Sequence, residues 1–222
     1  MTVPASAHLE TTSTHRPRIT RAINCGAIAG VVFIGVSFAQ AFTRSGFDLR
    51  QHALSALTLG GLGWLQVTNF VVTGLLAGAF AIALRQALRP GRADTAGPIL
   101  IGVYGIGMIG GGIFTPDPAL GWPPGAPAGL PEQLSLNSAL HTVCGAMAFL
   151  SLIAAGFVFA RRSAGQGHRG WAAYSCANSV AAFILTALPW SEESASLRFA
   201  AGALIISSWL AALSWRVRSG KA

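Results

Sequence analysis

The side chains best suited to chemistry gather in a short polar run, residues 46–55. It contains Asp48, Arg50 and His52, and lies between two apolar segments long enough to cross a bilayer. If this run is helical, Asp48 and His52 share one face, with Cβ atoms about 5–6 Å apart. A carboxylate there would orient the imidazole and favour its charged form, giving a general acid and base or two metal ligands. The alternative is an interfacial ion pair and helix cap.

Further polar residues fall at the same predicted depth. Asp117 ends the third apolar segment, and His141 lies near the start of the fourth. This convergence predicts a site in which His52 is the acid or base, oriented by Asp48. Asp117 would be a second acid or a metal ligand, and His141 a partner to either. Six residues near this depth are candidate substrate contacts: Arg50, Trp64, Gln66, Asn69, Trp122 and Arg198.

The same residues leave metal and cofactor content open. Two Asp and two His suit a divalent metal, although their spacing is not diagnostic. His52 and His141 at equal depth also allow bis-histidine haem ligation, which needs them on facing helices.

The composition predicts the element type that must position this site. The 222 residues are 52% hydrophobic and only 10% charged, against about 25% charged in soluble domains. Apolar runs of about 20 residues predict an all-α bundle of six transmembrane helices in one domain, residues 21–217. Residues 1–20 read as a disordered tail and 218–222 as a basic tail. The expected spans are 21–43, 62–87, 96–115, 136–160, 169–189 and 196–216.

The charge distribution predicts the orientation. Net charge is +8, and of 15 Lys and Arg residues all but Arg44, Arg50 and Arg198 fall on the side of the termini if there are six spans. Both termini should therefore be cytoplasmic in a multi-pass protein of the cell membrane. The basic charge then serves topology and anionic lipid head groups, and does not indicate nucleic-acid binding.

Three further segments carry predictions. Residues 48–60 are too short for a span and predict an interfacial or re-entrant helix that ends at Gly60-Gly61. The proline-rich segment 116–135 excludes a helix and predicts a stiff, extended cover. Residues 105–110 match the dinucleotide pattern GxGxxG. Because they lie inside an apolar span, we interpret these glycines, and the pairs Gly26/Gly30, Gly74/Gly78 and Gly107/Gly111, as helix-packing positions.

Three spaced blocks carry a family resemblance. The first block is Gly46-Phe47-Asp48, Arg50-x-His52-x-x-Ser55 and Gly63-Trp64-x-Gln66-x-x-Asn69-Phe70. The second is Gly110-x-x-Ile113-Phe114-x-x-Asp117-Pro118 and Gly121-x-Pro123-x-Gly125. The third is Leu140-His141-x-x-x-Gly145-x-x-x-Phe149. Over about residues 22–217 the chain resembles the bacterial multi-pass membrane family numbered 998 in the domain-of-unknown-function series. The resemblance implies a shared outer-face site but no reaction. Many relatives carry a Gln-Arg pair where this chain has Ser196-Leu197-Arg198, so the last helix departs from the pattern.

The leading hypothesis is an outer-leaflet site that binds or transforms a lipid or isoprenoid-like molecule, with Asn69 hydrogen-bonding the substrate. Membrane lipids are the expected partners. The alternative is a non-catalytic transporter or accessory subunit of a membrane complex. Few polar residues fall near the predicted midplane, where transporters place their sites, which argues mildly against transport. A bis-histidine haem redox protein is the third hypothesis.

Overall fold

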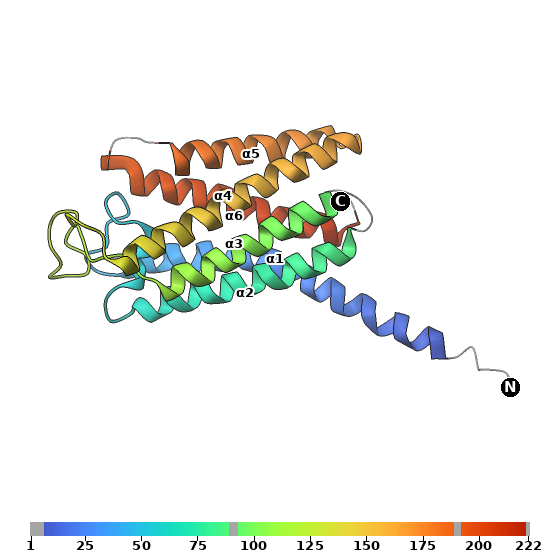
Figure 1. The fold of residues 1–222 in the computed structure, drawn as a ribbon, viewed down its shortest axis with the longest axis horizontal. Helices are drawn as coiled ribbons and strands as arrows, with labels where there is room; N and C mark the ends of the chain where they lie inside the picture. Colours follow the sequence, from blue (N-terminus) through green and yellow to red (C-terminus); the bar gives the residue numbers. More distant parts are fainter. Residues whose placement is uncertain (1–6, 89–92, 189–191, 221–222) are drawn as a thin grey trace.

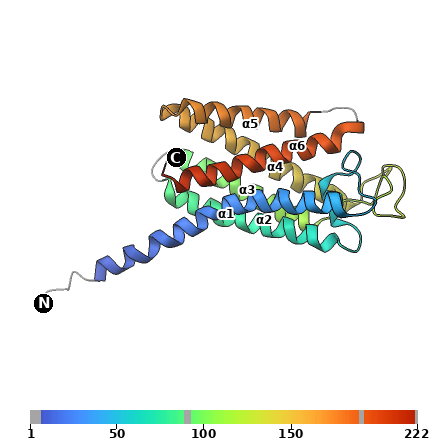
Figure 2. The same ribbon diagram turned by 180° about the vertical axis from the view of Figure 1, so that it is seen from behind.

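The computed structural model is an all-α bundle whose six long helices run side by side (Figure 1). It describes residues 7–88, 93–188 and 192–220. Figure 2 shows the same bundle from behind, with both termini at one end. The helices are α1 (Ala7–Thr43), α2 (Gly63–Ala87), α3 (Ala93–Ile113), α4 (Leu136–Gly165), α5 (Arg169–Ala187) and α6 (Glu192–Arg218), with a short 3₁₀ helix, η1 (Leu54–Thr58), between α1 and α2.

The helix bounds follow the apolar runs of the sequence. Among the residues that the structure describes, five helices are long and apolar enough to cross a membrane, and the first of these spans is Arg21–Thr43. From there α1 extends back to Ala7. The interfacial helix predicted over 48–60 is shorter than expected, a single turn at Leu54–Thr58.

The α5 helix is not among those five candidate spans, and its polar residues explain why. Ser175, Asn178 and Ser179 are buried, whereas Phe183 is exposed. Trp209 donates from Nε1 to Ser175 Oγ (3.0 Å), and Asn178 donates from Nδ2 to the Ile205 carbonyl (3.1 Å). The polar face of α5 thus points at α6 and its apolar face points outward, the opposite of a helix that faces water.

Each helix contacts the next along the chain, and α6 returns to α1, which closes a ring. Glycines make the closest crossings. A Cβ on Gly105 would lie 2.7 Å from the Gly74 carbonyl oxygen on α2, and one on Gly107 would lie 2.7 Å from the Cys144 carbonyl oxygen on α4. The GxGxxG segment therefore lies within α3 and packs against helices on both sides, which confirms the packing interpretation for its three glycines. The interpretation is wrong for Gly78, where an added Cβ would meet no atom within 4 Å.

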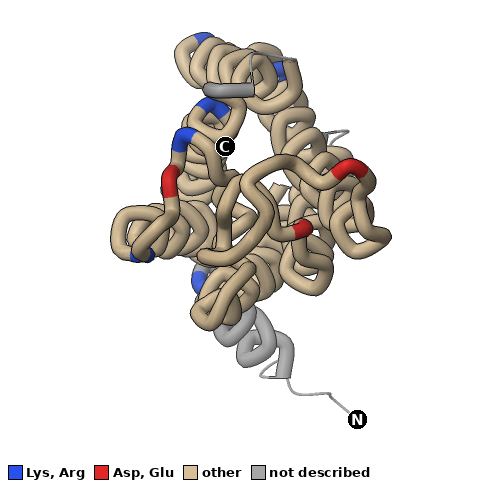
Figure 3. The backbone as a smooth tube through the Cα atoms, turned by 90° about the vertical axis from the view of Figure 1, so that its left-hand side faces the viewer, with Lys and Arg blue, Asp and Glu red and all other residues tan. Residues whose placement is uncertain are grey.

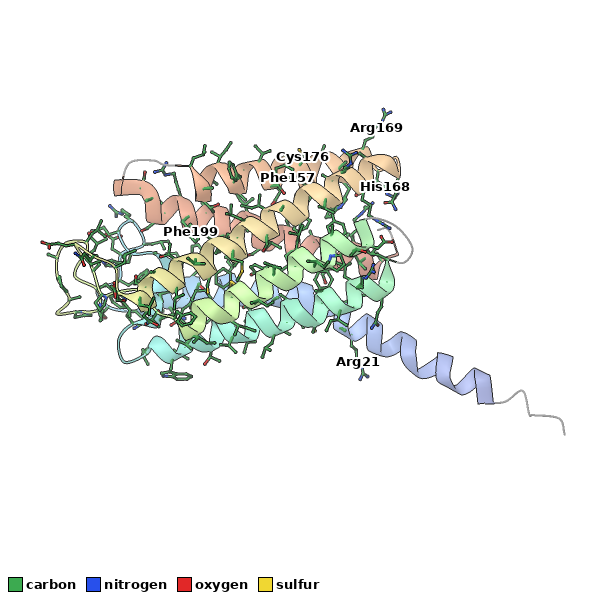
Figure 4. All side chains as sticks on the ribbon, viewed as in Figure 1. Arg21, Phe157, His168, Arg169, Cys176 and Phe199 are labelled. Carbon is green, nitrogen blue, oxygen red and sulfur yellow. The ribbon has the colours of Figure 1, made fainter. Side chains whose placement is uncertain are left out.

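Aromatic residues from four helices fill the interior. Phe33 of α1 packs against Phe70 of α2 and Phe149 of α4, with ring centroids 5.8 and 6.4 Å apart. Phe149 in turn meets Phe199 of α6 edge-on at 4.7 Å. Figure 4 shows Phe199 in the half of the bundle nearer the loops. This cluster holds α4 to α6 on the side that carries the long connections.

The two ends of the bundle differ in charge and in buried polar groups. Arg21, His168 and Arg169 lie at the end that holds the termini (Figure 4). At the same end Arg162 of α4 donates to the carboxylate of Asp94 at 2.5 Å, and the Asp94 side chain is fully buried. Arg85 of α2 donates to the Asp94 backbone carbonyl at 2.9 Å. A buried ion pair thus joins α3 to α4, and α2 reaches the same residue.

Candidate functional site

The loop end, formed by residues 44–62 and 114–135, contains a cavity of ≈ 760 Å³. Residues from the 48–56 and 116–134 segments and from the first turns of α4 and α6 line it. Figure 3 looks onto this end and shows few acidic and basic positions on it. Five of the predicted site residues line the cavity: Asp48, Arg50, His52, Asp117 and Trp122.

His52 is held by backbone groups on both sides of its ring. Its Nδ1 accepts a hydrogen bond from the Asp48 backbone N–H at 2.9 Å. The hydrogen must therefore be on Nε2, which donates to the Leu120 carbonyl at 3.0 Å. The imidazole is buried and neutral, and it joins the 46–55 run to a loop 68 residues further along the chain.

The sequence predicts that the Asp48 carboxylate orients His52, and this prediction is wrong. The group of Asp48 that bonds to the His52 ring is its backbone N–H. One carboxylate oxygen accepts from the Arg50 backbone N–H at 2.9 Å, and the other accepts from Gln51 Nε2 at 3.3 Å. An aspartate that bonds the amide two residues on favours a turn over a helix, and residues 49–51 form a turn. These hydrogen bonds lower the pKa of the Asp48 carboxyl, the Arg50 amide contributing most.

Trp122 is buried, only 3% exposed. Its Nε1 donates to the Ala56 carbonyl at 2.9 Å, and its ring meets Phe47 edge-on at 5.1 Å. The Arg44 guanidinium lies over the ring at 4.8 Å. Trp122 is thus the anchor that fixes the 116–134 segment onto the 46–58 segment.

Arg44 is a structural residue of this end that the site prediction omitted. It donates to the Leu57 carbonyl at 2.5 Å and to the Leu59 carbonyl at 2.6 Å. These are carbonyls at the end of the short η1 helix, which have no partner within it. The one sequence signal for Arg44 was that it breaks the one-sided charge distribution.

Asp117 holds the N-cap residue of the α4 helix, Ser135. Its carboxylate accepts from the Ser135 backbone N–H at 2.9 Å and from Ser135 Oγ at 2.6 Å. Ser135 is the N-cap residue of α4, and its hydroxyl oxygen accepts from the Ser138 N–H at 3.1 Å. The hydrogen bonds from Ser135 lower the pKa of the Asp117 carboxyl.

This lowered pKa predicts a pH-dependent stabilisation. Because the folded-state pKa of Asp117 is below the ordinary value of about 3.9, its contribution is complete above that value and is lost as pH falls through the folded pKa. We expect the difference in melting temperature in detergent between the wild type and Asp117→Asn to be constant above about pH 5 and to shrink below about pH 4. A difference that stays the same down to about pH 2.5 would contradict this role.

His141 lies outside the cavity lining. Its Nδ1 donates to the Phe114 carbonyl at 2.8 Å and lies 3.1 Å from the Gly111 carbonyl. Its ring meets Phe70 edge-on at 6.4 Å. His141 therefore binds carbonyl groups at the end of α3. The sequence did not predict this role.

In the part of the chain that the structure describes, the side chains predicted as metal or haem ligands do not come together in one ligand site. Among the described residues, no group of three or more His, Cys, Asp or Glu side chains is placed to hold a metal ion. An axial haem ligand needs a free imidazole lone pair. The Nδ1 of His52 is occupied by the Asp48 N–H, and its Nε2 carries the hydrogen bonded to Leu120. These contacts leave His52 no free lone pair for a haem iron.

Gln66 and Asn69 belong to the interface between α1 and α2. Gln40 donates to Gln66 Oε1 at 2.7 Å, and Gln66 donates to Ser37 Oγ at 2.9 Å. Asn69 Nδ2 lies 3.1 Å from the Phe33 carbonyl and 3.2 Å from Ser37 Oγ. Gln66 and Asn69 are buried and do not line the cavity, so their roles here are in helix association.

The last two candidates also lie away from the cavity lining. Trp64 is 61% exposed on the first turn of α2. Arg198 donates from Nε to the Ser194 carbonyl on its own helix at 3.2 Å. Instead Ser196, which the site prediction omitted, lines the cavity and donates to the Gln51 carbonyl at 2.9 Å. The structure thus joins α6 to the 46–55 run through a serine.

The fold and its five apolar spans define a multi-pass helical membrane protein, with a cavity under the loops at one end. Residues 27–216 match the family described as "Protein of unknown function (DUF998)", and the chain belongs to that family. Searches of curated proteins and of solved structures found no match. The family resemblance noted in the sequence is thereby confirmed.

Proposed function

We propose that this protein binds a lipid-like amphiphile in the loop-end cavity. The cavity itself carries the proposal: its volume of ≈ 760 Å³ falls within the range of about 300–1,000 Å³ that small-molecule sites occupy. Leu120, Leu130 and Leu134 offer apolar surface for a chain. Asp48, Arg50 and Ser196 offer polar groups for a head group.

Binding is better supported than transformation of the ligand. A general base needs a lone pair within reach of a substrate proton. The Nδ1 lone pair of His52 is taken by the Asp48 N–H, and the hydrogen bonds from Ser135 lower the pKa of Asp117, which makes its carboxylate a weak base. We therefore propose that His52 and Asp117 hold the loops that form the cavity and do not act as general bases.

We further propose that all six helices span the membrane, with both termini cytoplasmic and the loop end outside. α5 lies at the edge of the bundle, alongside the other helices (Figure 1), where it contacts α4 and α6, and its polar side chains are buried. Arg21 and Arg169 lie at the end with the termini (Figure 4), as the positive-inside rule requires of the cytoplasmic side. The cavity then opens at the level of the outer leaflet.

Filling the cavity tests the binding proposal. Ala195 lines it and is exposed on the first turns of α6, so Ala195→Trp adds bulk without disturbing the core. We expect native mass spectrometry of the gently purified wild type to show a co-purified lipid-like molecule at one per chain. The Ala195→Trp variant should lose it while keeping its membrane level and melting temperature.

The matched control is Ala128→Trp. Ala128 is also exposed and lies in the 116–134 segment, but it is not a lining residue. Its variant should retain the bound molecule. Equal occupancy in the wild type and in Ala195→Trp would refute binding in this cavity, and co-purification with a stoichiometric protein would favour an accessory subunit instead.

A further inference from the structure

The cavity presents two carboxylates to an occupant from two separate loops. Asp48 belongs to the 46–55 run and Asp117 to the loop after α3, and both line the cavity. Among the described lining residues, Arg50 is the single Lys or Arg side chain. His52 adds no charge, because its Nδ1 accepts a hydrogen bond. The described lining therefore carries one net negative charge.

Arg50 neutralises Asp48 only weakly. Its side chain is 82% exposed, and its Nε lies 3.9 Å from Asp48 Oδ1. Exposed ion pairs at such separations contribute little, because water screens them. The guanidinium can turn away at little cost and leave the carboxylate to an occupant.

Both carboxylates retain capacity to accept hydrogen bonds. A carboxylate offers about four lone-pair sites. Asp48 accepts from the Arg50 amide and from Gln51, and Asp117 accepts two hydrogen bonds from Ser135. Hydrogen bonds lower the pKa of both groups, so both remain ionised at neutral pH.

We propose that the amphiphile bound in this cavity carries an ammonium head group, which donates to Asp48 and is further attracted by Asp117. The proposal rests on the function proposed above and specifies its ligand class. Charge-assisted N–H···O bonds to a carboxylate are stronger than neutral ones. An anionic head group would instead meet two like charges. The positive N-terminus of α4 does not offset them, because it is already capped by Ser135, which bonds to Asp117.

The test titrates the purified full-length chain with two lipids of identical acyl chains. Phosphatidylethanolamine carries an ammonium, whereas phosphatidylglycerol does not. Native mass spectrometry counts the bound lipids, and the difference between wild type and Ala195→Trp isolates binding in the cavity. We expect that difference to favour phosphatidylethanolamine about tenfold or more. Asp48→Asn should reduce the preference to about twofold or less.

Glu132→Gln is the matched control, since Glu132 is an exposed acid of the same loop region that does not line the cavity. It should leave the preference unchanged. A preference for phosphatidylglycerol, or one that survives Asp48→Asn, would refute the ammonium inference while leaving cavity binding intact. No difference between wild type and Ala195→Trp with either lipid would refute the function itself.

A third arm separates a lipid from a free amine. Glycerophosphoethanolamine has the same head group without acyl chains. It should show no detectable binding at the lipid concentrations used. Binding as tight as that of the lipid would contradict the amphiphile and favour a small soluble amine.

Discussion

Asp94→Ala is expected to destabilise the bundle by about 3–5 kcal/mol, because it leaves a largely buried Arg162 without its partner. Asp94 is fully buried and accepts from Arg162 at 2.5 Å. The loss should appear as a lower melting temperature in detergent and a reduced amount of protein in the membrane. Arg162→Met should have a comparable effect, because it leaves the Asp94 charge buried and unpaired.

The double variant measures the coupling between Asp94 and Arg162. Removing both charges eliminates the penalty of an unpaired buried ion, so Asp94→Ala combined with Arg162→Met should be less destabilising than either change alone. Arg169→Met is the matched control, since Arg169 is an exposed basic residue at the same end of the bundle. Strictly additive losses in the double variant would show that the two side chains are not coupled.

Trp122→Ala is expected to open the loop end. Truncating a buried Trp costs about 3–5 kcal/mol, and here it also removes the hydrogen bond to Ala56 and the ring beneath Arg44. Because these contacts join loops rather than spanning helices, the loss should be local. Limited proteolysis within 116–134 should accelerate strongly while the helices stay protected, and the lipid-like occupant should be lost.

Trp64→Ala is the control for this variant, since Trp64 is a tryptophan at the same end that is 61% exposed. It should leave both proteolysis and occupancy unchanged. If Trp122→Ala leaves the loop as resistant as the wild type, then Trp122 is not the anchor. If it unfolds the entire bundle, the loop end is part of one cooperative unit with the helices.

The element types and approximate bounds were predictable because the apolar runs match the lengths needed to cross a bilayer. The packing role of Gly74 and of the GxGxxG glycines was predictable for a related reason, since small residues at these spacings allow helices to approach. The expected span 96–115 begins slightly inside α3, because Asp94 reads as a surface residue until its ion pair with Arg162 is seen.

The candidate site was predictable in depth but not in direction. Counting residues along spans places Asp48, Asp117 and His141 at one level, and two of them do line one cavity. The direction of each side chain around its helix is a separate variable that depends on packing. Gln66 and Asn69 face α1, and His141 faces the end of α3, so the predicted cluster divides into three separate sets of contacts.

The sequence by itself determined an all-α membrane bundle, its family and the polar loop end, because composition, run length and spaced motifs are properties of the chain alone. The tertiary structure decided what the polar residues do. His52 is neutral and fixed because its ring lies between the Asp48 N–H and the Leu120 carbonyl, a contact across 68 residues. Such partners are backbone groups brought together by folding, and a backbone group leaves no residue-specific signature in a sequence.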